Sequence, residues 1–234
     1  NFDVLHSSLV DIRCFVEGLQ SYMVSNRFFE FLDILKQGLP VNADHFDEDK
    51  RITAMCFICY TVIEELIITS MREDIDELLA SDAKKVQQER AIKLKIASFS
   101  ERPQGYWGVR PDCVSMHCWQ TAVFEMAGLD RNATPTRRLH SLTMAANAVY
   151  TEYKAHVLPS KKSKDSNDNV LSADDLVPIF VFIITQCNLR NPLLNTDLLW
   201  ELCHPDQLHG EPGYYLTLYE SAVQYIVHFD ENES

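Results

Sequence analysis

Glycine is scarce in this sequence, with 7 residues among 234. A β-sandwich or barrel made of many short strands needs a tight turn after almost every strand, and glycine supplies many of those turns. Hydrophobic residues make up 46% of the chain, which is typical of a globular protein with a buried core. The low glycine content therefore argues against an all-β fold.

Basic side chains are also in short supply. The chain has 21 Lys and Arg against 34 Asp and Glu, for a formal net charge of −13. The densest basic cluster, residues 161–164, is followed directly by Asp165 and Asp168. Proteins that bind nucleic acid or anionic lipid use a basic patch for this purpose. We therefore expect neither ligand.

A long hydrophobic run without charge is missing too. The most apolar stretch, residues 55–71, is interrupted by Glu64 and Glu65, which predicts that it is not a membrane span. The chain starts without Met and without a signal-peptide pattern. We expect it to be part of a longer protein.

The seven cysteines do not follow a known metal pattern. Cys56 and Cys59 share one face of an expected helix, and Cys113, His117 and Cys118 lie close together in the sequence. Structural zinc needs four ligands, and no second cysteine pair has the required spacing. Each set has two interpretations, a metal site or helix packing. We favour packing, with reduced thiols in the cytosol and no metal or cofactor.

Hydrophobic residues recur with the period of an α-helix along nearly the whole chain, as at Leu9, Ile12 and Val16. No segment alternates convincingly like a strand, so we predict an all-α fold. We expect an N-terminal helical bundle over residues 1–80 packed on a larger helical domain over residues 81–234. The expected helices span residues 2–20, 26–37, 51–71, 72–80, 82–98, 111–127, 136–157, 172–187, 195–203 and 213–229.

Two loops stand out between these helices. Residues 102–108 are rich in aromatic residues and glycine, which predicts a structured loop. Residues 159–169 are polar and of low complexity, so we expect an exposed, mobile loop.

The segment after the polar loop predicts a buried helix with an acidic start. Ser172 and Asp175 have capping-box spacing, and the helix dipole favours both Asp174 and Asp175 in the first turn. Capping alone would explain the two aspartates. Pro178 removes the hydrogen bond that the Asp174 carbonyl would accept, which predicts a particular backbone shape there. The apolar run 179–184 predicts a central helix, and such a helix is a rigid mount for a charge at its end.

The last helix is preceded by a second distinctive motif. Gly210 and Gly213 predict a tight turn at its start. Tyr214 and Tyr215 point about 100° apart on a helix, so one can pack inward while the other faces solvent. An exposed tyrosine beside an acid is a frequent hot spot at interfaces, although two core aromatics would be the simpler explanation.

The two motifs together resemble the Vps-nine (vacuolar protein sorting nine) catalytic domain. The matching residues are Ser172-Ala-Asp-Asp-Leu-Val-Pro178 and Gly210-Glu-Pro-Gly-Tyr-Tyr-Leu-Thr217. The resemblance covers residues 171–227, and residues 1–80 are similar in helix pattern to the bundle of Rabex-type members. The family accelerates GDP release from small GTPases of the early-endosomal Rab-five subfamily. The resemblance thus implies a cytoplasmic exchange factor that is recruited to early endosomes.

The resemblance also implies roles for single residues. Asp174 resembles the catalytic acidic finger, which enters the nucleotide site of the GTPase. Pro178 resembles a proline that shapes the helix, and Tyr214 and Thr217 resemble residues that face the GTPase switch regions. The expected GTPase-binding residues are Asp175, Pro178, Tyr214, Tyr215 and Thr217.

The sequence departs from the family pattern at Leu176, Leu198 and Pro212, which leaves the preferred Rab and the rate of exchange open. The alternative to an exchange factor is a helical scaffold that binds a Rab without catalysing exchange.

Overall fold

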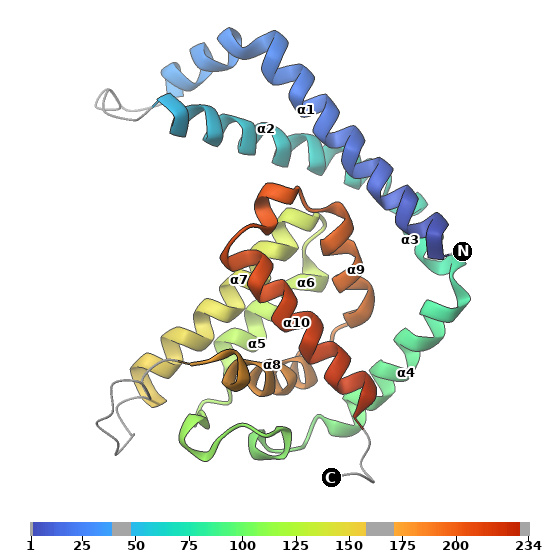
Figure 1. Ribbon diagram of the computed structural model, residues 1–234, viewed down its shortest axis with the longest axis vertical. Coiled ribbons are helices and arrows are strands. Elements are labelled where there is room, and N and C mark those ends of the chain that lie inside the picture. Colours follow the sequence, from blue (N-terminus) through green and yellow to red (C-terminus); the bar gives the residue numbers. More distant parts are fainter. Residues whose placement is uncertain (1, 39–47, 158–170, 230–234) are drawn as a thin grey trace. The chain divides into compact units, whose positions relative to one another are not determined.

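The computed structural model describes residues 2–38, 48–157 and 171–229, so the predicted loop at residues 159–169 lies outside it. Every regular element within the described ranges is a helix, which confirms the predicted all-α fold (Figure 1). The elements are α1 (Phe2–Gly38), α2 (Glu48–Ser70), α3 (Arg72–Ser81), α4 (Ala83–Phe99), η2 (Gln104–Trp107), η3 (Pro111–Cys113), α5 (Gln120–Met126), α6 (Gly128–Arg131), α7 (Pro135–Glu152), the π-helical turn η4 (Tyr153–Val157), α8 (Ala173–Cys187), α9 (Pro192–Leu202), η7 (Pro205–Leu208) and α10 (Glu211–His228).

The chain forms two compact units, residues 1–78 and 79–234. In the first unit α1 packs against α2, where Val16, Tyr60 and Ile63 form a small buried cluster. The two helices predicted over residues 2–37 are one helix in the structure. No glycine or proline stands between the two predicted segments, so nothing in the sequence stops the helix there.

Helix α2 contains a segment with the length and composition of a membrane span. Residues Ile52–Ser70 have a mean hydropathy of 1.8, and no other single helix in the described chain is both long and apolar enough to cross a membrane. Glu64 within the segment is buried on the side that also holds Tyr60 and Ile63. Core helices of soluble proteins have the same composition, so these values do not by themselves identify a span.

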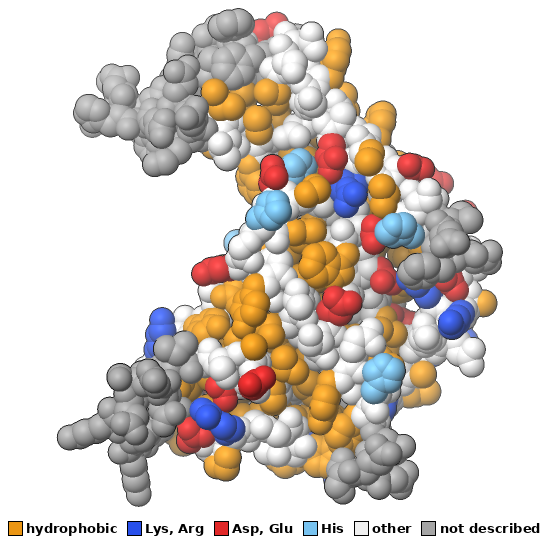
Figure 2. Space-filling model, in the orientation of Figure 1, with side chains coloured by type: hydrophobic (Ala, Val, Ile, Leu, Met, Phe, Trp, Pro, Cys, Tyr) orange, Lys and Arg blue, Asp and Glu red, His pale blue; other side chains and the backbone are white. Residues whose placement is uncertain are grey.

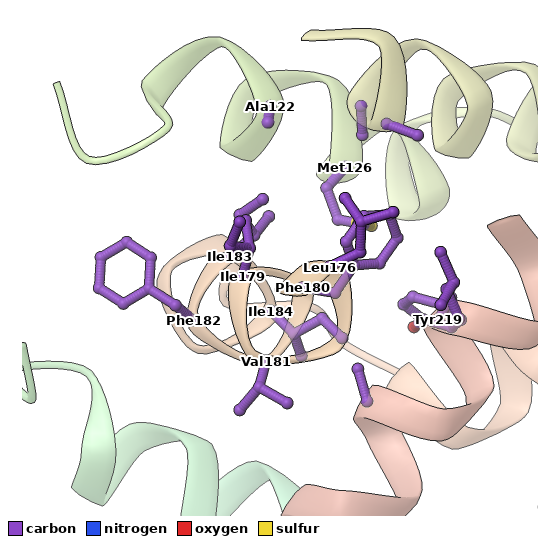
Figure 3. Close-up of a cluster of buried hydrophobic side chains, with 14 of the residues drawn as sticks. Ala122, Met126, Leu176, Ile179, Phe180, Val181, Phe182, Ile183, Ile184 and Tyr219 are labelled. Atoms are coloured by element: carbon purple, nitrogen blue, oxygen red, sulfur yellow. The ribbon is translucent and has the colours of Figure 1, made fainter. Parts of the chain in front are cut away.

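The second unit has one extensive core, and α8 lies at its centre. Helices α4, α5 and α10 and the short η2 all contact α8. Its side chains point in every direction: Ile179 and Ile183 face Ala122 and Met126 of α5, and Val181 points away from them (Figure 3). The predicted central helix is therefore confirmed, and its end cannot shift without disturbing the core.

Several predicted helix starts of this unit are confirmed by their caps. The carboxylate of Asp82 accepts hydrogen bonds from the backbone N–H groups of Lys84 and Lys85 at the start of α4. Thr134 caps α7 through its hydroxyl, and Pro135 follows in the first turn. Such local signals are well defined in a sequence because capping side chains bond to neighbouring backbone groups.

The helix predicted over residues 111–127 is wrong. Residues 111–113 form the single turn η3, and α5 begins only at Gln120. Between them Cys118 and Trp119 adopt left-handed conformations, with φ of 52° and 54°. The indole N–H of the buried Trp119 donates to the Gln104 side chain at 2.9 Å. Burial of this side chain against a polar partner stabilises a left-handed backbone at Trp119, which interrupts the predicted helix just before α5.

Candidate functional site

The first turn of α8 carries the predicted capping box. Ser172 is the N-cap, and its hydroxyl oxygen accepts a hydrogen bond from the backbone N–H of Asp175 at 3.3 Å. In return, Oδ2 of Asp175 accepts from the backbone N–H of Ser172 at 3.0 Å and from its hydroxyl at 2.8 Å. These reciprocal bonds fix the turn that contains Asp174.

The two adjacent aspartates have different surroundings. The Asp175 side chain is only 8% exposed, and its Oδ1 forms an ion pair with Nε of Arg110 at 3.0 Å. Asp174 is exposed, and within the described part of the chain its carboxylate has neither a hydrogen-bond nor an ion-pair partner. Asp175 thus makes contacts within the protein, whereas the Asp174 carboxylate is exposed to solvent.

Pro178 lies inside α8 rather than in its first turn, and it is half-buried. Proline has no backbone N–H, so the Asp174 carbonyl lacks its usual partner four residues later. The sequence predicted a departure from regular helix geometry at this point. In the structure Pro178 leaves the Asp174 carbonyl without its helix hydrogen bond.

The turn before α10 requires its two glycines. Gly210 is the N-cap with φ of 78°, a positive φ that glycine adopts without strain. Gly213 is buried, and a Cβ atom there would collide with the backbone carbonyl of Leu208. This close approach holds the start of α10 against the end of η7, and so positions the tyrosines that follow.

Tyr214 and Tyr215 point in different directions. Tyr214 is exposed, whereas Tyr215 is buried with its ring centroid 6.5 Å from that of Tyr150 on α7. Thr217, one turn after Gly213, is exposed and its hydroxyl donates to the Gly213 carbonyl at 3.0 Å. Tyr214 and Thr217 are therefore accessible on the surface of α10, and Tyr215 packs in the core behind them.

Burial also sets the ionisation of the tyrosines behind Tyr214. It raises the pKa of Tyr150 to about 12, and the nearby Tyr215, Tyr214 and Glu211 add to this shift. Burial raises the pKa of Tyr215 as well. Both hydroxyls are neutral near pH 7, so this part of the site carries no phenolate charge.

A loop that precedes α5 contributes Arg110, which the sequence did not single out. The side-chain amide of Gln104 donates to the Ser115 carbonyl at 2.7 Å and accepts from the Ser115 N–H at 3.0 Å. The predicted aromatic loop beside it is ordered by Trp107, which packs edge-on against Phe99 with ring centroids 5.2 Å apart. No periodic pattern could have identified Arg110, because its partner Asp175 is distant in sequence.

A partly buried polar network joins helices of the second unit. Arg138 of α7 donates to the side-chain oxygen of Asn195 on α9 at 2.9 Å, and Asn195 donates to Asp130 at 3.2 Å. Tyr219 of α10 donates to the Pro192 carbonyl at 2.9 Å. These bonds join α7, α9 and α10 through paired polar groups, which favours one arrangement of the helices.

Hydrophobic side chains make up part of the surface around α10 (Figure 2). Figure 2 shows hydrophobic side chains gathered over α7, α8 and α10, with separate Asp and Glu side chains among them. Exposed Tyr214 and half-buried Tyr150, Val177 and Leu208 belong to these helices and their connecting turn. A hydrophobic surface with a few acids suits a protein partner better than a phosphate-rich ligand.

No group of metal-ligating side chains occurs among the described residues. All seven cysteines are unpaired thiols. Cys113 and Cys59 are buried, as expected for packing residues, but Cys118 is exposed and His117 lies with it in a turn. The prediction that Cys113, His117 and Cys118 share a helix is thus wrong, for the same reason as the helix itself.

Comparison with known proteins identifies the second unit. Residues 119–231 match the Vacuolar sorting protein 9 (VPS9) domain. Protein sprint of Drosophila melanogaster is 25% identical over 227 residues, which are 95% of this chain and 12% of that protein. Ras and Rab interactor 2 of Homo sapiens is 27% identical over 101 residues, which are 43% of this chain and 10% of that protein.

A third relative is Receptor-mediated endocytosis protein 6 of Caenorhabditis briggsae. It is 33% identical over 109 residues, which are 46% of this chain and 9% of that protein. The chain spans 9–12% of the length of these three relatives.

Proposed function

Because this chain belongs to the VPS9 domain family through residues 119–231, we propose that it is a guanine nucleotide exchange factor for Rab GTPases. The observation that carries the proposal is the carboxylate of Asp174. It is exposed and without a partner among the described residues, and it stands in the first turn of a helix in which residues 179–185 are all buried. A charge mounted in this way keeps its position when it enters a partner.

The mechanism follows from how a GTPase holds its nucleotide. The β-phosphate is bound by a P-loop lysine and by Mg²⁺. The Asp174 carboxylate enters this site, pairs with the lysine and repels the phosphate, which weakens GDP binding. By linkage, incoming nucleotide weakens binding of the exchange factor to the same degree, so the factor is released and acts again. No proton transfer or covalent step is required.

The remaining site residues form the proposed docking surface for the GTPase. Tyr214 and Thr217 are exposed on α10, which packs against α8, and they contact the switch regions of the GTPase. Pro178 shapes the backbone that presents Asp174. Asp175 and Tyr215 are predicted members of the same surface, and their burial gives them an indirect part, in which they hold Asp174 and Tyr214 in place.

The substrate that we propose is a Rab of the early-endosomal Rab-five subfamily, with action in the cytoplasm at early endosomes. The motifs resemble those of exchange factors for this subfamily. The name of Ras and Rab interactor 2 refers to Rab proteins, and the name of Receptor-mediated endocytosis protein 6 refers to endocytosis.

Release of fluorescent GDP from a panel of Rabs tests the proposal. The chain is added in sub-stoichiometric amounts, as wild type and as Asp174→Ala. Asp74→Ala is the matched control, because Asp74 is also an exposed acid in the first turn of a helix and its removal changes the net charge equally. We expect fast release that is lost in Asp174→Ala and unchanged in Asp74→Ala, with Rab-five subfamily members responding most strongly.

Absence of release from every Rab by a folded wild-type chain would contradict the exchange proposal. Direct binding to nucleotide-free Rab would then identify the alternative function, a non-catalytic Rab-binding scaffold. If Asp174→Ala releases GDP as fast as wild type, the chain is still an exchange factor, but a group other than Asp174 is responsible.

A further inference from the structure

The Arg110 guanidinium lies where two parts of the second unit meet. Its Nε is 3.0 Å from Oδ1 of Asp175 at the start of α8 and 3.4 Å from Oδ1 of Asp112. Its Nη2 donates to the Cys113 sulfur at 3.4 Å. The two contacts within η3 fix the direction of the arginine side chain, so its third contact brings a positioned cation to the first turn of α8.

The loop that carries Arg110 is itself held from both sides. Gln104 bonds to both backbone groups of Ser115 and accepts from the Trp119 indole. The Ser115 hydroxyl also donates to the carboxylate of Glu152 at the end of α7. A loop anchored in this way is held as firmly as the core. It therefore keeps Arg110 in place, and the ion pair of Arg110 in turn keeps Asp175 in place.

This contact has two consequences for the neighbouring Asp174. Asp175 bonds through Oδ2 to Ser172 and through Oδ1 to Arg110, so the turn is fixed at both carboxylate oxygens. The Arg110 charge also neutralises that of Asp175, which leaves Asp174 as the uncompensated acid of the turn. Removal of Arg110 would leave two adjacent carboxylates that repel each other.

We propose that Arg110 is a positioning residue for nucleotide exchange, which acts through Asp175 to hold the Asp174 carboxylate in the orientation that enters the GTPase. This inference rests on the proposed exchange function. Arg110 does not itself bind nucleotide. Its loss should lower the turnover rate of exchange and leave the KM for the Rab nearly unchanged, because the docking residues of α10 are untouched.

The test compares Arg110→Gln, Arg110→Lys and the double variant Arg110→Gln/Asp174→Ala with wild type. Arg72→Gln is the matched control, because Arg72 forms an exposed ion pair with Asp76 in the first unit and carries the same charge. We expect a roughly tenfold lower turnover rate in Arg110→Gln, since small displacements of a reacting group are costly. Arg110→Lys should recover part of this loss, and Arg72→Gln should behave as wild type.

A second measurement is independent of the GTPase. Amide hydrogen exchange of residues 172–176 in the free protein should be several-fold faster in Arg110→Gln than in wild type or Arg72→Gln, because the turn is less restrained. The double variant should release GDP no more slowly than Asp174→Ala alone, since Arg110 acts only through that carboxylate.

The outcomes separate this inference from the function on which it rests. If Arg110→Gln releases GDP as fast as wild type, the positioning role is overturned and the exchange function stays intact. The same holds if Arg72→Gln lowers the rate as much as Arg110→Gln does. A further loss in the double variant would show that Arg110 acts elsewhere, which also overturns it. If the wild type releases no GDP, the exchange function is wrong and the positioning role in exchange falls with it, whatever hydrogen exchange shows about the turn.

Discussion

Tyr214 and Tyr215 have ring centroids 5.5 Å apart, yet Tyr214 is 42% exposed and Tyr215 only 4%. One face of the first turn of α10 therefore belongs to the surface and the other to the core. The two residues are chemically identical, so parallel substitutions separate a role in partner binding from a role in folding.

We expect Tyr214→Ala to reduce Rab binding and exchange without lowering the melting temperature, because little buried surface is lost. Tyr215→Ala should instead reduce the free energy of unfolding by about 3 kcal/mol, the usual cost of removing a buried aromatic ring. Thermal unfolding and GDP release, measured on both variants, check this. A large loss of stability in Tyr214→Ala would assign that ring to the core.

Gly213→Ala should destabilise the second unit by roughly 2 kcal/mol, because the new methyl group meets the backbone carbonyl of Leu208, which cannot move aside easily. Gly105→Ala is the control, since a Cβ at Gly105 meets no atom within 4 Å. Chemical denaturation of the two variants gives the comparison. Equal midpoints would show that the turn before α10 can relax.

Replacement of Pro178 by Ala should lower the rate of GDP release without destabilising the protein. Alanine supplies the N–H that the Asp174 carbonyl lacks, which draws this turn into regular helix geometry. Removal of an internal helix proline does not weaken the helix, so the melting temperature should stay level or rise. The exposed Pro205, in the first turn of η7, provides the control Pro205→Ala. Wild-type exchange in Pro178→Ala would contradict this role.

Glu89 should make the stability depend on pH between about 4.5 and 7. Its buried carboxylate accepts from the backbone N–H groups of Leu193 and Leu194, at 3.3 and 3.1 Å. Burial nevertheless raises its pKa to about 7 from an ordinary value of 4.5. Between these values the folded protein binds the proton more tightly than the unfolded chain, so the free energy of unfolding falls as the pH rises from about 4.5 to 7.

The variant Glu89→Gln cannot titrate, and its free energy of unfolding should change less with pH over this interval. Denaturation curves at several pH values measure the difference from wild type. Glu101→Gln removes an exposed carboxyl from the same unit and should keep the wild-type slope. If the slopes of wild type and Glu89→Gln agree, the carboxyl of Glu89 titrates as it does in water.

Local signals account for what the sequence predicted correctly. The cap at Ser172 and the apolar run 179–184 depend on neighbouring residues, so both the start of α8 and its central position could be foreseen. The ion pair of Arg110 with Asp175 could not, because it joins residues that only the folded core brings together. For the same reason the sequence could not tell that Asp175 is internally bound while Asp174 is not.

The failed helix over residues 111–127 shows the same limit. Nothing in the local pattern there opposes a helix, and the left-handed Trp119 arises because its indole binds Gln104 in the core. Helix geometry predicted that one of the two tyrosines could face inward and the other outward, but not which one. Their assignment required the position of Tyr150 on another helix.

The burial of α8 on all sides limits how far this site can be reduced in size. A synthetic peptide of residues 172–187 would contain the acidic turn, but it would expose the apolar run to water and associate with itself. It would also lack the arginine that fixes the turn. An inhibitor that imitates this surface therefore has to reproduce the scaffold around the helix, and a short linear mimic will not suffice.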